Sequence, residues 1–247
     1  MKNFLIALQF LTTIPVKIRS EIKPGDFGKS LLYFPIVGML IGLALACISS
    51  LLAFFPAMVK GVFILVASIF ITGGIHLDGF ADTCDGFYAG RSKENILQIM
   101  RDSRIGVMGA VGIVCLLLLK FTLLVNIPQN ILWKSLIMAT AFARWSQVLA
   151  CVSSKYARED GKAKLFIEYA RAKEAIIGGL LVLILFFILA GTKGLALFIL
   201  NLVCIFLFIT YIKSRITGMT GDTIGAASEI AEIPVFLFSL IIAKINI

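Results

Sequence analysis

Long apolar runs recur along this chain, and they restrict it to folds that lie in a membrane. A helix needs about 20 mostly apolar residues to cross the hydrocarbon core of a bilayer. The chain is 60% hydrophobic and 15% charged, whereas soluble domains carry about a quarter charged residues. We therefore predict an all-α, polytopic helical bundle with about seven transmembrane helices. The expected spans lie near residues 36–55, 61–77, 106–126, 131–153, 175–191, 195–212 and 231–247.

The N-terminal segment begins with a lysine and an apolar run, as a signal peptide does. It lacks a small-residue cleavage site, and Pro15 follows the run directly. We expect a retained helix that lies at the membrane interface or dips into it as a re-entrant segment. The 247 residues are expected to form one transmembrane domain, 1–247.

The charged residues are sorted along the chain. Segments 1–35, 76–105, 154–174 and 213–232 carry most of the 23 basic residues and all 14 acidic ones. Basic loops stay in the cytoplasm, so these segments are predicted to face it, with the C-terminus outside. The net charge of +9 is assigned to topology and to anionic lipid headgroups, with no nucleic acid as partner. The lysines assigned to the outer side are Lys60, Lys120, Lys134, Lys193 and Lys244.

An acidic stripe interrupts this apolar chain. Asp78, Asp82 and Asp85 are spaced i, i+4 and i+7, which places all three on one face of a helix. Like charges in this arrangement repel one another, so a cation is expected to offset them. Mg²⁺ prefers hard oxygen ligands and usually binds through one or two carboxylates together with substrate phosphate. The stripe therefore predicts a magnesium–diphosphate site rather than a solvated loop.

The one histidine and several arginines are further candidates. His76 falls about 160° from Asp78 on an ideal helix, which favours a structural role over a general base or a metal ligand. Arg101 and Arg104 lie on the same segment as the aspartates, and guanidinium groups match phosphate oxygens. Arg144 lies within a span, about 15 Å along the helix from Ser154. Phosphate contact is favoured for Arg144 over a structural pair with a carboxylate.

Two later polar segments add candidates. In 155–174 most charges are assigned to solvent, and the site residues are expected among Tyr156, Arg158, Glu159 and Gly161. In 218–232, Asp222 and Glu229 are seven residues apart and share a helical face. They are predicted to form a second metal-binding or nucleoside-binding wall that completes the metal site. The alternative is a helix-packing patch of small residues in which the acids are caps.

The distribution of these groups favours an enzyme over a transporter. Every segment rich in acidic and basic residues reaches the same side of the membrane, and the chain shows no clear internal repeat. A transporter would place polar groups nearer the midplane and would show repeats. Two other enzyme classes, CDP-alcohol phosphotransferases and prenyltransferases, also use aspartates at the membrane edge to act on a diphosphate. The aspartates of both classes have different spacings.

Several motifs carry a resemblance over nearly the whole chain. They are FLTTIPV at 10–16, FPIVG at 34–38, GGIHLDGFADTCDG at 73–86, IMRDSRIGVMG at 99–109, the AR-W run at 143–145, YARE-x-G at 156–161 and TGDTIGAASEIAE at 220–232. Together they resemble the cobalamin synthase family, adenosylcobinamide-GDP ribazoletransferase. Lys162 stands where the family often has an apolar residue, and Ala143 stands in place of a serine. Neither departure affects a carboxylate, so the implied activity is unchanged.

The resemblance implies a catalytic domain in the cytoplasmic membrane of a bacterium or archaeon, with its site facing the cytoplasm. The family transfers adenosylcobinamide phosphate from its GDP-activated form to α-ribazole or its 5′-phosphate and releases GMP. The resemblance leaves the oligomeric state open, including a homo-oligomer. Mg²⁺ is the expected cofactor, with Asp82, Asp78 and His76 as catalytic residues, Arg101, Arg104, Arg144 and Arg158 as phosphate contacts, and Asp78, Asp82, Asp85, Asp222 and Glu229 as metal ligands.

Overall fold

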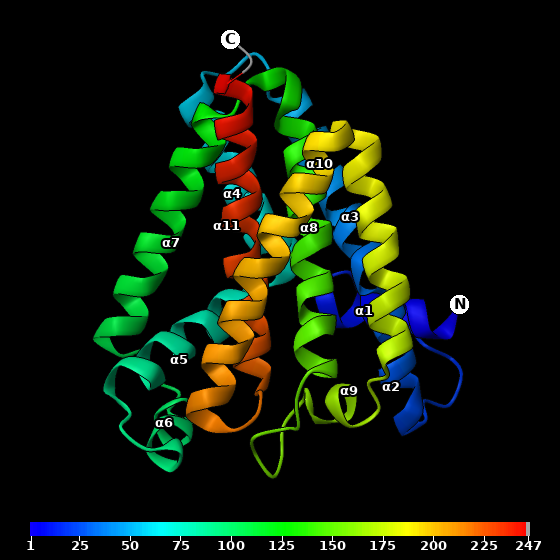
Figure 1. Cartoon of the computed structure of the whole chain (residues 1–247), viewed down its shortest axis with the longest axis vertical. Helices are drawn as coiled ribbons and strands as arrows, with labels where there is room; N and C mark the ends of the chain where they lie inside the picture. The colour runs from blue at the N-terminus through cyan, green and yellow to red at the C-terminus, as the bar shows by residue number, and fades with distance from the viewer. Residues whose placement is uncertain (246–247) are drawn as a thin grey trace.

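The protein is a bundle of helices (Figure 1). The computed structural model describes residues 1–245, and among these residues no strand occurs. The predicted all-α class is therefore confirmed. The helices are α1 (Lys2–Leu11), α2 (Pro24–Ser30), the 3-10 turn η1 (Leu31–Tyr33), α3 (Phe34–Leu51), α4 (Ala57–Thr72), α5 (Ile75–Ala89), α6 (Lys93–Ile99), α7 (Val107–Asn126), α8 (Gln129–Val152), α9 (Lys164–Glu168), α10 (Ala172–Ile216) and α11 (Gly221–Ile245).

Within the described residues, five helices are long and apolar enough to cross a membrane, or six if the bent pair α4–α5 is one span. The 45-residue α10 departs from helical geometry at Gly191, with φ 60° and ψ −141°, and Figure 1 shows the chain reversing direction there. Glycine adopts positive φ without the steric cost of a Cβ. The turn expected at 191–194 is confirmed, and the count of about seven spans stays a prediction.

The boundary predicted for the span 61–77 is wrong at its C-terminal end. α4 ends at Thr72, and α5 begins at Ile75 after a bend of 93°. Gly73 and Gly74 make the bend, because both adopt left-handed backbone with φ of 65° and 69°. The aspartate-bearing helix therefore leaves the direction of α4 and runs across one end of the bundle (Figure 1).

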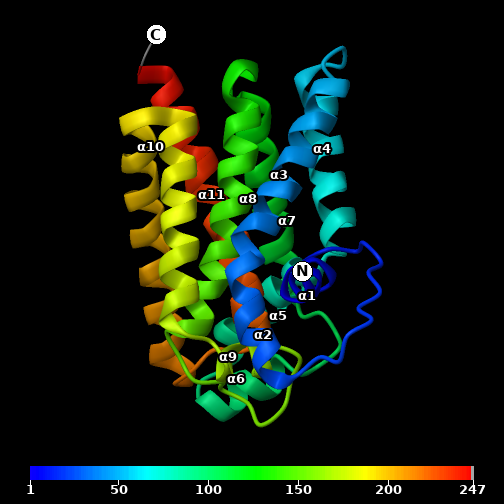
Figure 2. The same cartoon turned by 90° about the vertical axis from the view of Figure 1, so that its right-hand side faces the viewer.

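Burial differs sharply between the long helices. α8 stands in the middle of the bundle and is buried over most of its surface, whereas α7 and α10 are mostly exposed (Figure 2). The side chains exposed on these two helices include large apolar ones, such as Leu118, Ile184 and Phe206. Exposure of a contiguous apolar surface of this kind to water is unfavourable, so it must contact another apolar medium. Together with the long apolar helices, it identifies a membrane-embedded protein.

The polar segments gather at one end of the bundle. Figure 1 places α5, α6 and α9 at the end opposite the C-terminus. The charge sorting of the sequence therefore matches a real division of the molecule. Lys120 is the exception, because it is buried inside the bundle on α7 rather than placed at the outer end. α1 is a helix as expected, and its position at a membrane interface stays a prediction.

Candidate active site

α5 carries the acidic stripe, as the spacing predicts. Asp78 lines a cavity of about 280 Å³, and Asp222 of α11 lines the same cavity. Asp82 is half-buried, and the charges that act most strongly on it are the carboxylates of Asp222 and Asp78, opposed by Arg158. The carboxylates of three aspartates from two helices thus lie near enough to act on one another electrostatically.

Close packing of α5 against α11 brings these groups together. A Cβ at Gly79 would lie 2.7 Å from the backbone oxygen of Asp222 and 2.8 Å from its Cα. A side chain at position 79 would therefore force the two helices apart. A Cβ at Gly225, one turn further along α11, would lie 3.3 Å from the Cα of His76, a tight contact but a looser one. The small residues of the closing segment therefore serve helix packing, and a role of its acidic residues in the site stays a prediction.

Asp85 has a structural role that its spacing did not predict. Its two carboxylate oxygens accept hydrogen bonds from the backbone amides of Gly106 and Gly109, each at 2.7 Å. These amides belong to the first turn of α7, where N–H groups lack partners within the helix. Asp85 therefore caps α7 from another helix, and a Cβ at either glycine would collide with it. Each of the two oxygens keeps a second lone pair, so a place for Asp85 among the metal ligands stays a prediction.

Arg158 is the arginine that the structure brings to the acidic cluster. Its guanidinium lies 2.8 Å from Asp222 Oδ2 and also donates to the backbone oxygen of Met100 at 3.3 Å. The loop that carries it is held beside α11 by two backbone hydrogen bonds, from Ala157 to Met219 and from Met219 to Lys155. Arg158 can therefore reach a phosphate beside Asp222 without a rearrangement of the fold.

The two arginines before α7 are exposed instead. Arg104 forms an ion pair with Asp102 at 2.8 Å, and its hydrogen bonds lower the pKa of Asp102 to about 2. Both residues line an open hollow beside Asp82 and Asp85. Arg101 is also exposed, and its charge acts on Tyr156. The structure places these groups at the rim of the site, where phosphate contact stays a prediction.

Arg144 and Glu229 lie in a separate, buried charge cluster. Lys120 Nζ lies 2.6 Å from Glu229 Oε2 and 2.7 Å from Glu232 Oε2. Arg144 is 2% exposed and donates a hydrogen bond to the hydroxyl of Ser228. It also interacts electrostatically with both glutamates. Two cations thus balance two anions inside the bundle. The structure places Arg144 beside this cluster and not in the wall of the 280 Å³ cavity, so phosphate contact by Arg144 stays a prediction. It also places Glu229 with Lys120, in a different cavity from Asp78 and Asp222.

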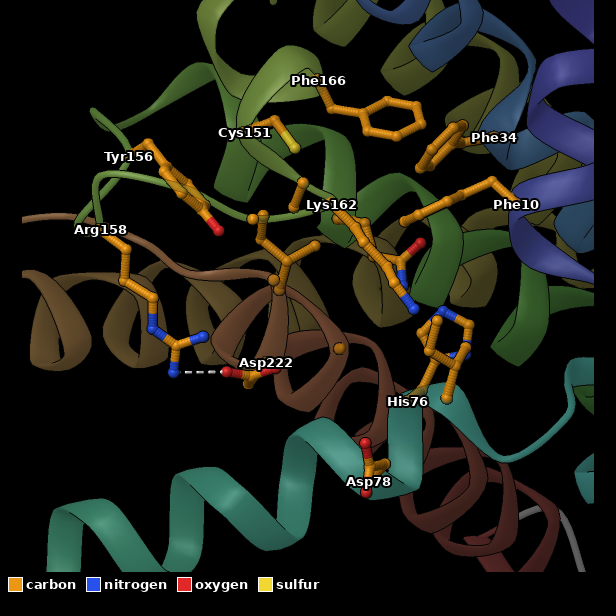
Figure 3. A pocket seen from close by; sticks show the side chains of 17 residues that line it. Phe10, Phe34, His76, Asp78, Cys151, Tyr156, Arg158, Lys162, Phe166 and Asp222 are labelled. Atoms are coloured by element: carbon orange, nitrogen blue, oxygen red, sulfur yellow. Dashed lines mark ion pairs between the residues drawn. The ribbon is translucent and has the colours of Figure 1, made fainter. Parts of the chain in front are cut away.

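His76 lies in the wall of the cavity rather than away from the aspartates. It is 3% exposed, and both His76 and Asp78 line the 280 Å³ cavity (Figure 3). The ideal helix phase misplaced it because His76 stands at the first turn after the bend, where neighbouring helices define the cavity. Sequence reasoning also missed Gln147, which lines the cavity from α8 one turn beyond Arg144. A polar residue in an apolar span was the available signal.

A profile of the family described as "Cobalamin-5-phosphate synthase" matches residues 3–241. This chain belongs to that family. Proteins named adenosylcobinamide-GDP ribazoletransferase are similar over nearly the whole length. The one from Acetivibrio thermocellus is 37% identical over 234 residues, 94% of each chain. The one from Clostridium novyi is 36% identical over 246 residues, 99% of this chain and 98% of the relative. No solved structure matches.

Membership of the cobalamin synthase family makes the chain a transferase and confirms the resemblance seen in its motifs. Its acidic site fits a Mg²⁺ ion that is held by protein and substrate together. Among residues 1–245, no three His, Cys, Asp or Glu side chains are arranged to hold a metal by themselves. Asp78 and Asp222 nevertheless line one cavity, and both lie near enough to Asp82 for their charges to act on it. Such a set suits an ion whose remaining ligands come from a substrate diphosphate and water.

Proposed function

We propose that this chain transfers adenosylcobinamide phosphate from its GDP-activated form to α-ribazole or its 5′-phosphate. A ribose hydroxyl oxygen bonds to the phosphorus on the cobinamide side, and the bond from that phosphorus to the bridging oxygen breaks. GMP leaves with that oxygen, and adenosylcobalamin or its 5′-phosphate forms. The observation that supports this proposal is a cavity with Asp78, Asp222 and Arg158 in its wall, in a chain similar to ribazoletransferases.

Each residue of the site has a role in this reaction. Asp82, Asp78 and Asp222 would hold Mg²⁺ on the diphosphate. When bound, the ion would neutralise charge that develops on the departing GMP. Arg158 lies against Asp222 and would hold phosphate oxygens with its guanidinium fork. Asp78 or His76 accepts the proton of the attacking hydroxyl, because both face the cavity.

The site is proposed to face the cytoplasm of a bacterial or archaeal cell. Its segments carry most of the lysines and arginines, which remain on the cytoplasmic side of a membrane. Both substrates are polar, nucleotide-like molecules, and a cytoplasmic site gives them direct access. No observation favours a lipid product, which a CDP-alcohol phosphotransferase or a prenyltransferase would form. None favours a transporter either, which would move its substrate across the membrane without converting it.

The reaction can be tested with the purified chain in lipid nanodiscs. Adenosylcobinamide-GDP, α-ribazole and Mg²⁺ are expected to give GMP and adenosylcobalamin in equal amounts, and omission of the ribazole should stop GMP release. Release of GMP without a cobalamin product, or no release at all, would contradict the proposal. Orientation is tested in vesicles, where added substrates should be converted by inside-out but not by right-side-out preparations.

A further inference from the structure

A second hollow lies between the N-terminal helices and the start of α10. Its volume is about 210 Å³, and it shares no described lining residue with the 280 Å³ cavity. The two figures of the whole chain show α1 lying across the direction of the long helices beside it (Figures 1 and 2). The polar side chains in its wall are Asn3, Lys29, Tyr33, Lys173 and Glu174. Tyrosine and lysine are typical of a membrane–water interface.

Two acceptor oxygens at this hollow lack partners. The Oε2 of Glu174 and the Oδ1 of Asn3 are buried and accept no hydrogen bond from the described residues. Glu174 is 3% exposed, and its ion pair with Lys173 joins the lysine Nζ to the other oxygen, Oε1, at 3.8 Å. A buried acceptor without a donor is costly, most of all on a charged group. The two oxygens therefore indicate a ligand that donates hydrogen bonds and carries a positive charge.

The same hollow also offers positive charge. Lys29 and Lys173 line it, and both are exposed, so their ammonium groups are free to turn toward a ligand. Lysine binds phosphate as a point charge. The ligand that satisfies all of these groups is zwitterionic, with an ammonium for Glu174 and Asn3 and a phosphate for the two lysines.

The hollow continues onto an apolar face of α10. Ile177 lines the hollow, and Leu180 and Ile184 follow it at i+3 and i+7, on the same side of the helix. All three side chains are exposed, and they belong to the apolar surface that must contact lipid. A ligand with acyl chains can lay them along this strip, whereas a soluble phosphate compound would leave the strip unused.

We infer that this hollow binds the headgroup of a phospholipid that carries a primary ammonium group, of the phosphatidylethanolamine type. The ammonium donates to Glu174 and Asn3, the phosphate contacts Lys29 and Lys173, and the acyl chains lie along α10. The volume of about 210 Å³ suits a headgroup and leaves the chains outside. This inference goes beyond the proposed function, because no residue of the hollow belongs to the proposed active site.

Lipid binding to the delipidated chain in detergent, measured by native mass spectrometry, tests the inference. Dioleoyl phosphatidylethanolamine should bind about tenfold more tightly than dioleoyl phosphatidylcholine, because the quaternary ammonium of choline has no N–H to donate. Glu174→Gln should make the two affinities equal. Glu94→Gln is the matched control on an exposed position of α6, outside the hollow, and should keep the preference.

Three results would overturn the inference. Equal affinities in the wild-type chain, or a preference that survives Glu174→Gln, would show that the neighbouring lysines alone neutralise Glu174. Tighter binding of phosphatidylglycerol than of phosphatidylethanolamine would assign the hollow to an anionic lipid. Glycerophosphoethanolamine, which lacks acyl chains, should bind on the order of a hundredfold more weakly, and equal binding would assign the hollow to a soluble phosphate compound.

A second variant keeps the test decisive if Glu174→Gln fails to fold. Lys29→Gln, at an exposed position, should weaken the binding of both lipids about threefold, the effect of one exposed charge. Lys17→Gln, at an exposed loop position outside the hollow, should leave both affinities unchanged. Equal lipid affinities in Lys29→Gln and the wild-type chain would place the bound lipid elsewhere and overturn the inference.

Discussion

Replacing Asp82 by asparagine is expected to lower Mg²⁺-dependent GMP release on the order of a hundredfold or more. The amide keeps the size of the side chain but loses the charge that would hold the metal. The same change should leave the melting temperature unchanged or higher, because Asp82 lies among the like charges of Asp78 and Asp222. Turnover and thermal melting of one purified preparation measure both effects.

Glu94→Gln is the control for this prediction, because it removes an acidic charge from an exposed position of α6. It should change neither activity nor melting. A folded Asp82→Asn variant with normal Mg²⁺-dependent turnover would exclude Asp82 from the site. A loss of activity that accompanies a large fall in melting temperature would instead assign Asp82 to the fold.

Replacing Lys120 by methionine is expected to destabilise the bundle by about 3–5 kcal/mol. The change leaves Glu229 and Glu232 buried without the ammonium that lies 2.6 and 2.7 Å from their oxygens. Arg144 alone then faces two negative charges. For a chain of this size, the expected fall in melting temperature in detergent micelles is roughly 10 °C. Lys17→Met, at an exposed loop position, is the control and should melt as the wild type does.

A second variant distinguishes charge imbalance from lost packing. In Lys120→Met/Glu229→Gln, one glutamate remains for Arg144, so the buried cluster is neutral again. This double variant should recover much of the lost stability, because an unpaired buried charge costs more than the absence of an ion pair. If Lys120→Met melts like the wild type, or if the double variant melts lower still, the cluster does not stabilise the fold as described.

Local sequence pattern predicted the features that depend on local physics. The apolar runs predicted a bundle of membrane helices. The i, i+4, i+7 spacing predicted a helix with Asp78, Asp82 and Asp85 along one side. Charge sorting foretold which segments gather at one end. Each of these follows from helix periodicity or from the cost of charge in lipid, which act within a short stretch of chain.

Long-range pairing explains what the sequence could not supply. Asp85 bonds amides that follow it by 21 and 24 residues, and Lys120 meets glutamates more than 100 residues away. A carboxylate beside a bound metal and one that caps a distant helix look alike in sequence. Three phenylalanines that line the cavity are a similar case, because Phe10, Phe34 and Phe166 meet only once α1, α3 and α9 are folded together.

Mn²⁺ binding measured by electron paramagnetic resonance tests the central claim most directly, because Mn²⁺ accepts the same oxygen ligands as Mg²⁺. The central claim is that the substrate diphosphate completes a metal site begun by Asp78, Asp82 and Asp222. The chain alone should bind Mn²⁺ weakly, and adenosylcobinamide-GDP should tighten binding beyond that of substrate without protein. Asp82→Asn should abolish this gain. Tight binding without substrate, or a gain that survives Asp82→Asn, would contradict the claim.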